Sequence, residues 1–294
     1  MEEAILSDIL NNGVNSAGFD WKSSPSFTEL EMKTLDWLVD LLGLPTYFKV
    51  LTCLNSDPGQ GCGITQTTAT ESTMLAVMYA RARVVDMIKN NPAALPACGG
   101  LKKTVRQLLE DVRRTVEEED PAVITSPYHD PIVFRRLIAY FTDQAHYSVE
   151  KVAAFCGVKF RKLRTILDPI LKNYSEDRAR GLIPFFMLAT LGTTATCAVD
   201  SLRELGPICN REFIYLHADA AYGGGFLVCP EFRYLSNGIE YADSFNFNGH
   251  KEFQALFFSP MWFKDGVTAM KYFKIGNEVS EEWEETPAAI QVTF

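Results

Sequence analysis

The segment 213–251 constrains the fold most, because two short apolar runs within it each lead to a chemically reactive side chain. The first run, 213–217, leads to Asp219, and the second, 244–248, leads to Lys251. These two charged residues are 32 positions apart, which leaves room for a turn, a helix and a return strand. In open α/β sheets, ligands bind at the edge where such strands end. The pattern therefore predicts an acid and an amine at neighbouring strand ends.

An acid and an amine placed in this way have a specific chemical use. A lysine amine can form a Schiff base with an aldehyde cofactor. An aspartate can keep a pyridine nitrogen protonated, because a nearby opposite charge favours the charged form. Together they describe a site for pyridoxal phosphate (PLP), whose charged ring takes up electrons. Either residue alone is more often a surface lysine or a turn aspartate.

Composition narrows the classes of protein that the chain can belong to. The 294 residues, 47% of them hydrophobic, allow one large domain or two ordinary ones. The formal net charge of -9 argues against a nucleic-acid partner. Seven cysteines without a Cys-x-x-Cys pair indicate reduced thiols in a cytoplasmic protein, with neither a zinc site nor a disulfide framework. We expect no membrane partner, because no apolar run approaches the roughly 20 residues of a membrane span.

Two longer motifs make the chain recognisable. They are Leu-His-Ala-Asp-Ala-Ala-Tyr at 216–222 and Asn-Phe-Asn-Gly-His-Lys at 246–251. Both closely resemble the group II PLP-dependent amino-acid decarboxylases, with aromatic L-amino-acid decarboxylase and histidine decarboxylase as the nearest branch. The resemblance runs from about residue 4 to about residue 264. It implies the α/β architecture of PLP fold type I, the aspartate-aminotransferase-like fold.

The alternation of helical and apolar segments agrees with that fold. We expect a mainly parallel sheet with helices on both faces. Helices are predicted at 4–12, 28–42, 101–119, 149–156 and 201–210, and strands at 158–163 and 181–189. Thr28 with Glu31 has the spacing of a capping box at the start of its helix. The resemblance assigns 1–265 to the cofactor-binding large domain and leaves 266–294 as a divergent acidic tail, with the small C-terminal domain missing.

A glycine-rich loop at 59–63 precedes a long predicted helix that begins near Thr68. Thr68 and Glu71 have capping-box spacing, and the free amides of a helix N-terminus form a ready anion site. The spacing alone more often indicates a well-capped helix without a ligand. The resemblance implies more, because family members hold the PLP phosphate with a Ser-Ala-Ser segment. Thr68, Ala69 and Thr70 occupy those positions here.

The resemblance assigns the remaining site residues one by one. It places His146 against the face of the PLP ring, Thr194 near the ring and Ala221 against it. His250 contacts the phosphate or assists proton transfer. The catalytic residues that the resemblance implies are Lys251, His146, Asp219 and His250. The cofactor-binding residues that it implies are Thr68, Ala69, Thr70, His146, Thr194, Asp219, Ala221, Asn248, His250 and Lys251.

Several positions depart from the family pattern. Gly249 replaces a proline, and Glu252 replaces a large apolar residue and puts a negative charge beside Lys251. Tyr147 replaces a small residue, which we expect to crowd the pocket, and the segment 164–180 looks short. The family's N-terminal arm, its mobile loop with a proton-donating tyrosine and its small domain have no counterpart in the sequence.

The resemblance implies decarboxylation of an aromatic L-amino acid of the dopa, tryptophan or tyrosine type, giving the amine and CO₂. It also implies a homodimer that acts on this small-molecule substrate. Two alternatives stay open. In the first alternative, the chain is histidine decarboxylase-like. In the second, it is a catalytically inactive decarboxylase-like protein that lacks the catalytic loop. An aldehyde-forming oxidative side reaction of the kind found in related enzymes also stays open.

Overall fold

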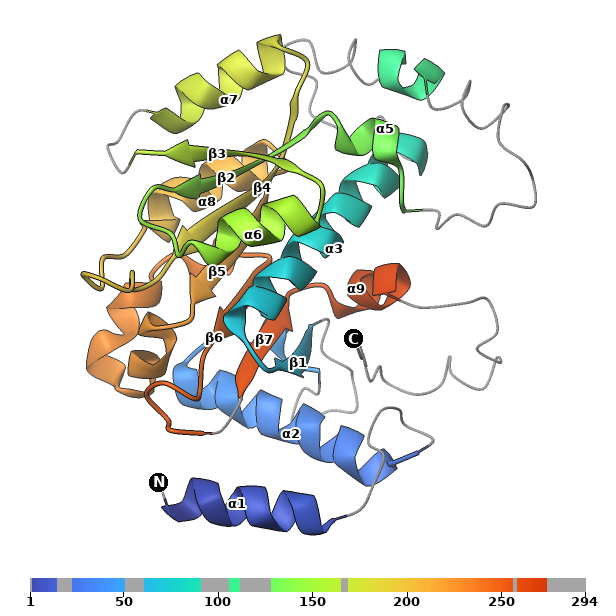
Figure 1. The fold of residues 1–294 in the computed structure, drawn as a ribbon. Helices are drawn as coiled ribbons and strands as arrows, with labels where there is room; N and C mark the ends of the chain where they lie inside the picture. The colour runs from blue at the N-terminus through green and yellow to red at the C-terminus, as the bar shows by residue number, and fades with distance from the viewer. Residues whose placement is uncertain are drawn as a thin grey trace. The chain divides into compact units, whose positions relative to one another are not determined.

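A computed structural model describes residues 2–14, 23–50, 61–90, 106–111, 128–164, 169–255 and 258–273 (Figure 1). The chain divides into two compact units. The first unit takes its residues from 1–72, 190–203 and 218–294, and the second from 73–189 and 204–217. Each unit is described below by itself.

Helices and strands alternate along the described residues, as the sequence predicts. The α-helices are α1 (Glu2–Gly13), α2 (Pro25–Leu42), α3 (Ala69–Asn90), α5 (Pro131–Phe134), α6 (Ser148–Phe155), α7 (Pro169–Ala179), α8 (Leu202–Arg211) and α9 (Gly266–Phe273). Short 3₁₀ helices are η1 (Thr46–Phe48), η3 (Gly223–Val228), η4 (Pro230–Ser236) and η5 (Ile239–Tyr241). The strands are β1 (Cys62–Gln66), β2 (Leu137–Thr142), β3 (Lys159–Leu163), β4 (Ile183–Thr190), β5 (Tyr215–Ala220), β6 (Ser244–Phe247) and β7 (Ser259–Phe263).

The described strands form one seven-stranded sheet in the order β1-β7-β6-β5-β4-β2-β3. Strand β2 runs parallel to both β3 and β4, whereas β7 runs antiparallel to both β1 and β6. Every residue of β4 and β5 is buried, as expected of strands covered on both faces. The sheet confirms the α/β class that the alternating pattern predicts.

In the first unit, helix α2 begins earlier than the capping-box pattern suggests. Pro25 occupies the first helical turn, where its missing N–H is not needed, and Ser24 precedes it. Thr28 lies inside the helix, with its hydroxyl 3.4 Å from the Ser24 carbonyl oxygen. The Glu31 carboxylate instead accepts the backbone N–H of Thr65 at 2.9 Å. The capping box predicted at Thr28 is therefore wrong, although the helix itself is confirmed.

The core of the first unit consists of buried apolar side chains from α2, β1, β6 and β7. Phe247 and Trp262 stack with centroids 6.1 Å apart and planes 3° apart. Gly63 lies against this indole, since a Cβ at Gly63 would lie 2.8 Å from the Trp262 ring nitrogen. The predicted loop at 59–63 is thus partly wrong, because Cys62 and Gly63 already belong to β1. Residues 59 and 60 lie outside the described part of the chain.

In the second unit, several sequence predictions are confirmed. The predicted helices at 149–156 and 201–210 correspond to α6 and α8, and the predicted strands at 158–163 and 181–189 correspond to β3 and β4. The helix predicted at 101–119 is described only over 106–111, where it is helical. The segment 164–180, which looks short in sequence, contains α7.

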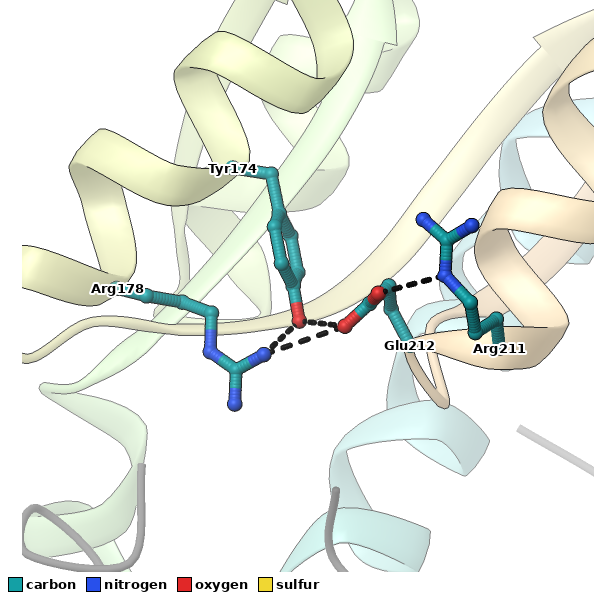
Figure 2. A network of polar contacts seen from close by, with 4 residues as sticks. All are labelled: Tyr174, Arg178, Arg211 and Glu212. Carbon is teal, nitrogen blue, oxygen red and sulfur yellow. Dashed lines mark hydrogen bonds and ion pairs between the residues drawn. The ribbon is translucent and has the colours of Figure 1, made fainter. Parts of the chain in front are cut away.

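Helix α7 is held by two buried charge clusters. Asp177 is fully buried and accepts hydrogen bonds from Arg161 of β3 and from the Tyr140 hydroxyl of β2, the latter at 3.0 Å. Figure 2 shows the second cluster, in which Glu212 accepts hydrogen bonds from three side chains. They are Tyr174 and Arg178 of α7 and Arg211 of α8. Both clusters tie the helix to the strands and helix beside it.

Candidate functional site

Strand β5 carries the acid that the sequence singles out. Asp219 is the fifth of its six residues and is 5% exposed. Its carboxylate accepts the backbone N–H of Ala221 at 3.1 Å. The expected run 213–217 is displaced, because Phe213 has a left-handed φ of 57° and lies in the turn before the strand. Asp219 therefore lies within the strand, close to its end, rather than after it.

The lysine lies in a tight turn after β6, which we call the lysine turn (residues 248–252). The Lys251 backbone N–H donates to the Asn248 carbonyl at 3.2 Å, and the Gly249 N–H donates to the Phe258 carbonyl at 2.8 Å. The Lys251 side chain is exposed, with Nζ 5.9 Å from the centroid of the Tyr222 ring. The predicted strand at 244–248 is confirmed as β6, one residue shorter.

A backbone hydrogen bond joins the acid-bearing and amine-bearing segments. The Asn248 N–H, at the start of the lysine turn, donates to the carbonyl of Ala221 at 3.3 Å. Ala221 in turn is the residue whose N–H binds the Asp219 carboxylate. The two segments that the sequence predicts to converge are thus neighbours in the first unit. Asn248 is also fixed through its side chain, whose oxygen accepts the Ser259 hydroxyl proton.

Two buried polar atoms in the lysine turn have no hydrogen-bond partner among the residues that the structure describes. They are Nδ1 of His250 and Oε2 of Glu252. Burial raises the pKa of the Glu252 carboxyl above its ordinary value, while its own backbone N–H and the charges of Lys251 and His250 act in the opposite direction. The carboxyl rests against Gly225, where a Cβ would lie 2.8 Å from Oε2.

The Thr194 prediction concerns a turn between β4 and α8. Thr194 itself is exposed, at the tip of the turn. The neighbouring hydroxyl of Thr193 supports the turn, since it accepts the Ala198 N–H at 3.0 Å and lies 2.9 Å from the Thr196 hydroxyl. Gly192 has a φ of 95° and packs against Gly223, which explains a glycine at this point. The contact between Thr194 and a cofactor ring stays a prediction.

The predicted capping box at the start of α3 is confirmed. The Glu71 N–H donates to the Thr68 hydroxyl at 3.3 Å, and the Thr68 N–H donates to the Glu71 carboxylate at 3.2 Å. The Thr67 N–H donates to the same carboxylate oxygen at 3.0 Å. Ala69 and Thr70 form the first turn of the helix, beside this cap. The arrangement fits phosphate binding, which stays a prediction.

His146 follows β2 and belongs to the second unit. Its Nδ1 lies 2.8 Å from the Ser148 hydroxyl, and its ring lies 4.2 Å from the ring of Tyr147. Tyr147 is 65% exposed. His146 and Tyr147 belong to the second unit, whereas Asp219 and Lys251 belong to the first. The predicted stacking of His146 on the cofactor ring and the predicted crowding by Tyr147 involve residues of both units, so both stay predictions.

Sequence reasoning missed three residues that shape the site. Tyr222 lies beneath the lysine ammonium, Gly225 accommodates Glu252, and Ser259 binds Asn248. Tyr222 was visible in the motif at 216–222, and its aromatic ring next to a reactive lysine was a usable signal. Ser259 gave no signal, because it reaches the site only through the antiparallel return of β7.

The donor set fits a phosphorylated pyridine aldehyde better than a metal. A buried carboxylate, an exposed amine, a capped helix start and an unpartnered imidazole nitrogen match the charged parts of such a cofactor. No group of three or more His, Cys, Asp or Glu residues suited to a metal ion occurs within the described ranges. No described helix is long and apolar enough to cross a membrane.

Comparisons with known proteins agree with this donor set. The family model of the pyridoxal-dependent decarboxylase conserved domain matches residues 2–124 and 110–278. Aromatic-L-amino-acid decarboxylase of Rattus norvegicus is 40% identical over 284 residues, covering 92% of this chain and 50% of that protein. Histidine decarboxylase of Homo sapiens is 39% identical over 286 residues, covering 92% of this chain and 37% of that protein.

A solved structure extends the similarity to three dimensions. The crystal structure of Oryza sativa TDC with PLP and tryptamine superposes with a TM-score of 0.70 and 28% identity. It covers 90% of this chain and 50% of that one, so the chain spans about half the length of the relatives it matches. The fold is therefore that of the PLP-dependent decarboxylases, and the chain belongs to the pyridoxal-dependent decarboxylase family.

Proposed function

We propose that the chain binds PLP through Lys251 and serves the decarboxylation of an aromatic L-amino acid to its amine and CO₂. The observation that carries the proposal is the hydrogen bond from Asn248 to Ala221, because it joins the lysine turn to the segment that holds Asp219. The relatives support the same reaction, since they include aromatic-L-amino-acid decarboxylases.

Each residue has a separate task in this proposal. Lys251 supplies the amine that bonds to the cofactor aldehyde. Asp219 keeps the ring nitrogen protonated, because a buried carboxylate favours a positive charge beside it. When bound, the cofactor supplies the electron sink for the bond that breaks as CO₂ leaves. Thr68 and Thr70 hold the phosphate at the start of α3, together with Asn248 of the lysine turn.

The other assigned residues act around this core. Ala221 is small enough to lie against the ring, and Thr194 supplies a hydroxyl near it. Ala69 contributes backbone beside the phosphate, and His146 covers the ring face. His250 contacts the phosphate or carries a proton, since an imidazole can do either at neutral pH.

Covalent binding tests the proposal first. The full chain mixed with PLP is expected to show the visible absorbance band of a Schiff base, and borohydride reduction should fix the cofactor on Lys251 in a tryptic peptide. Lys251→Ala is expected to lose both signals completely, whereas Lys264→Ala, a matched lysine on the same unit, should keep them. A chain that gives no band would refute the proposal.

Substrate class is tested on the cofactor-loaded chain. We expect amine and CO₂ from dopa, tryptophan or tyrosine. Amine from histidine alone would favour the second candidate, which the human histidine decarboxylase relative supports. Aldehyde and hydrogen peroxide in place of amine would reveal the oxidative side reaction. A bound cofactor without any product would favour the inactive candidate, which Gly249 and Glu252 support as departures from the family pattern.

A homodimer is part of the proposal, because α1 and α2 present apolar side chains to solvent. Trp37 is 64% exposed, and Leu10 is 69% exposed. The exposed apolar residues of the two helices are Ile5, Leu6, Ile9, Leu10, Leu30, Trp37 and Leu41. A patch of this kind marks a surface that another chain covers. Sedimentation analysis should give twice the monomer mass, and Trp37→Glu should shift it toward the monomer.

Two smaller proposals complete the assignment. We propose a cytoplasmic location, supported by the cysteines within the described ranges, none of which forms a disulfide. Cell fractionation of the tagged full chain tests it. We also propose 1–265 as the cofactor-binding domain and 266–294 as a separate tail, although the family model extends to residue 278. Limited proteolysis should then cut the tail before the rest of the chain.

A further inference from the structure

Exposure alternates along the lysine turn. Lys251 is exposed, whereas Nδ1 of His250 and Oε2 of Glu252 are buried. Each residue beside Lys251 therefore has one polar atom inside the protein, whereas the Lys251 side chain is exposed and its ammonium lies 5.9 Å from the centroid of the Tyr222 ring. The two buried atoms thus belong to residues separated by one position in the turn.

These two groups complement one another chemically. An imidazole with its proton on Nδ1 is a donor, and a carboxylate oxygen is an acceptor. Neither atom is paired within the ranges that the structure describes. The two residues are separated by one position in the same tight turn, which places their side chains within reach of one another. One hydrogen bond between them would satisfy both atoms at once.

Gly225 leaves room for the Glu252 side chain. A Cβ at Gly225 would lie 2.8 Å from Glu252 Oε2 and 2.8 Å from its Cβ, so the side chain lies along bare backbone. Its own backbone N–H also supports the carboxyl. A glycine at 225 and a glutamate at 252 therefore fit as a pair.

We propose that Glu252 is a positioning residue for His250. Its carboxylate accepts the Nδ1–H of His250 after a side-chain rotation, which fixes the ring orientation and leaves Nε2 to exchange a proton. This is the carboxylate–imidazole arrangement by which proteins select one histidine tautomer. The use of Nε2 rests on the proposed function, whereas the pair itself is a property of the chain.

Imidazole nitrogen chemical shifts test the pair in the ¹⁵N-labelled full chain without cofactor. The sequence has four histidines, so His250→Asn identifies the signals of His250. At mildly alkaline pH, where imidazoles are neutral, His250 is expected to carry its proton mainly on Nδ1. Glu252→Leu, which replaces the carboxyl with an apolar group of similar size, should shift the tautomer ratio toward Nε2–H by about fivefold or more.

Conservative variants separate hydrogen bonding from packing. Glu252→Gln should keep the Nδ1–H tautomer, because its amide oxygen still accepts the proton. Glu231→Gln, an exposed acid of η4, serves as the charge control and should change nothing. A wild-type His250 protonated mainly on Nε2 overturns the proposal, and so does an unchanged ratio in Glu252→Leu.

The same samples distinguish this inference from the proposed function. PLP is added after the tautomer has been recorded, and the visible absorbance is measured. An Nδ1–H tautomer without cofactor binding keeps the pair and refutes only the proposed function. Cofactor binding with an Nε2–H tautomer refutes the pair and leaves the proposed function standing.

Discussion

Tyr174, Arg178, Arg211 and Glu212 form the Glu212 cluster, whose carboxylate differs from the buried polar atoms of the lysine turn in how it is paired. In the Glu212 cluster, Oε2 accepts from Tyr174 and Arg178, and Oε1 accepts from Arg211 at 2.9 Å (Figure 2). In the lysine turn, Nδ1 of His250 and Oε2 of Glu252 lack partners among the described residues. Both oxygens of the Glu212 carboxylate are therefore paired, whereas the two atoms of the lysine turn are not paired within the described residues.

The difference indicates which cluster serves structure and which serves chemistry. A buried polar atom without a partner costs on the order of 1 to 3 kcal/mol. Most such atoms in native proteins are satisfied, so an exception calls for a functional reason. In the lysine turn, we propose that the reason is the neighbouring amine of Lys251. The Glu212 carboxylate has no such neighbour, and its two oxygens are paired by side chains of α7 and α8.

The largest expected effect on stability comes from breaking the complete cluster. Glu212→Ala removes a charged acceptor from the buried side chains of Arg178 and Tyr174. Removing one partner of a buried ion pair costs about 3 kcal/mol or more. Urea unfolding should show this loss, while cofactor absorbance at low urea should stay unchanged. A loss under about 0.5 kcal/mol, the size expected of a surface substitution, would contradict the structural role.

The sequence anticipated these two regions unequally. The lysine turn was found because its chemistry lies in contiguous motifs, in which Asp219, Asn248 and Lys251 each follow an apolar run. The Glu212 cluster was missed, because its members come from 174–178 and 211–212 and carry no local pattern. Sequence periodicity predicts which apolar residues are buried, but it does not predict which distant acid a buried arginine pairs with.

The errors in the fold have equally local causes. The strand of Asp219 starts late, because Phe213 adopts a left-handed backbone that no residue pattern disclosed. The helix α2 starts early, because Pro25 already occupies its first turn. Element type was therefore predictable from apolar spacing, whereas element ends depended on single backbone conformations.

A smaller effect on stability is expected in the lysine turn itself. Gly249→Ala places a Cβ 2.5 Å from Cδ1 of Phe258, so the ring or the turn must move. Overpacking of this kind costs about 1 to 3 kcal/mol. We expect the variant to fold, with a slower rise of cofactor absorbance, because the displaced turn carries Lys251. Thermal unfolding and stopped-flow absorbance measure the two effects. Gly157→Ala is a control for general glycine replacement, because open space surrounds Gly157, although its φ of 64° adds strain.

The smallest expected effect is the pH dependence of stability. It distinguishes the two regions clearly, because it has opposite signs at Glu212 and Glu252. Hydrogen bonds from Tyr174 and Arg211 and the charges of Arg211 and Arg178 lower the pKa of Glu212 below its ordinary 4.5, although burial alone would raise it. A lowered folded-state pKa gives stability that is present above about pH 4.5 and is lost as the pH falls. Burial raises the pKa of Glu252, so its contribution is present below pH 4.5 and is lost as the pH rises through the folded-state value.

Glutamine variants test the sign of each pH dependence, because an amide has nearly the shape of a carboxyl group but does not titrate. The free energy of unfolding is measured from pH 3 to 7 for wild type, Glu212→Gln and Glu252→Gln. The advantage of wild type over Glu212→Gln should grow with rising pH, because the wild-type carboxylate becomes charged and paired. Its advantage over Glu252→Gln should shrink over the range just above pH 4.5, because the wild type must then hold a partly buried charge. Slopes of the same sign for both variants would show that the lysine turn satisfies its carboxylate as fully as the Glu212 cluster does, and the contrast between a structural and a chemical cluster would fail.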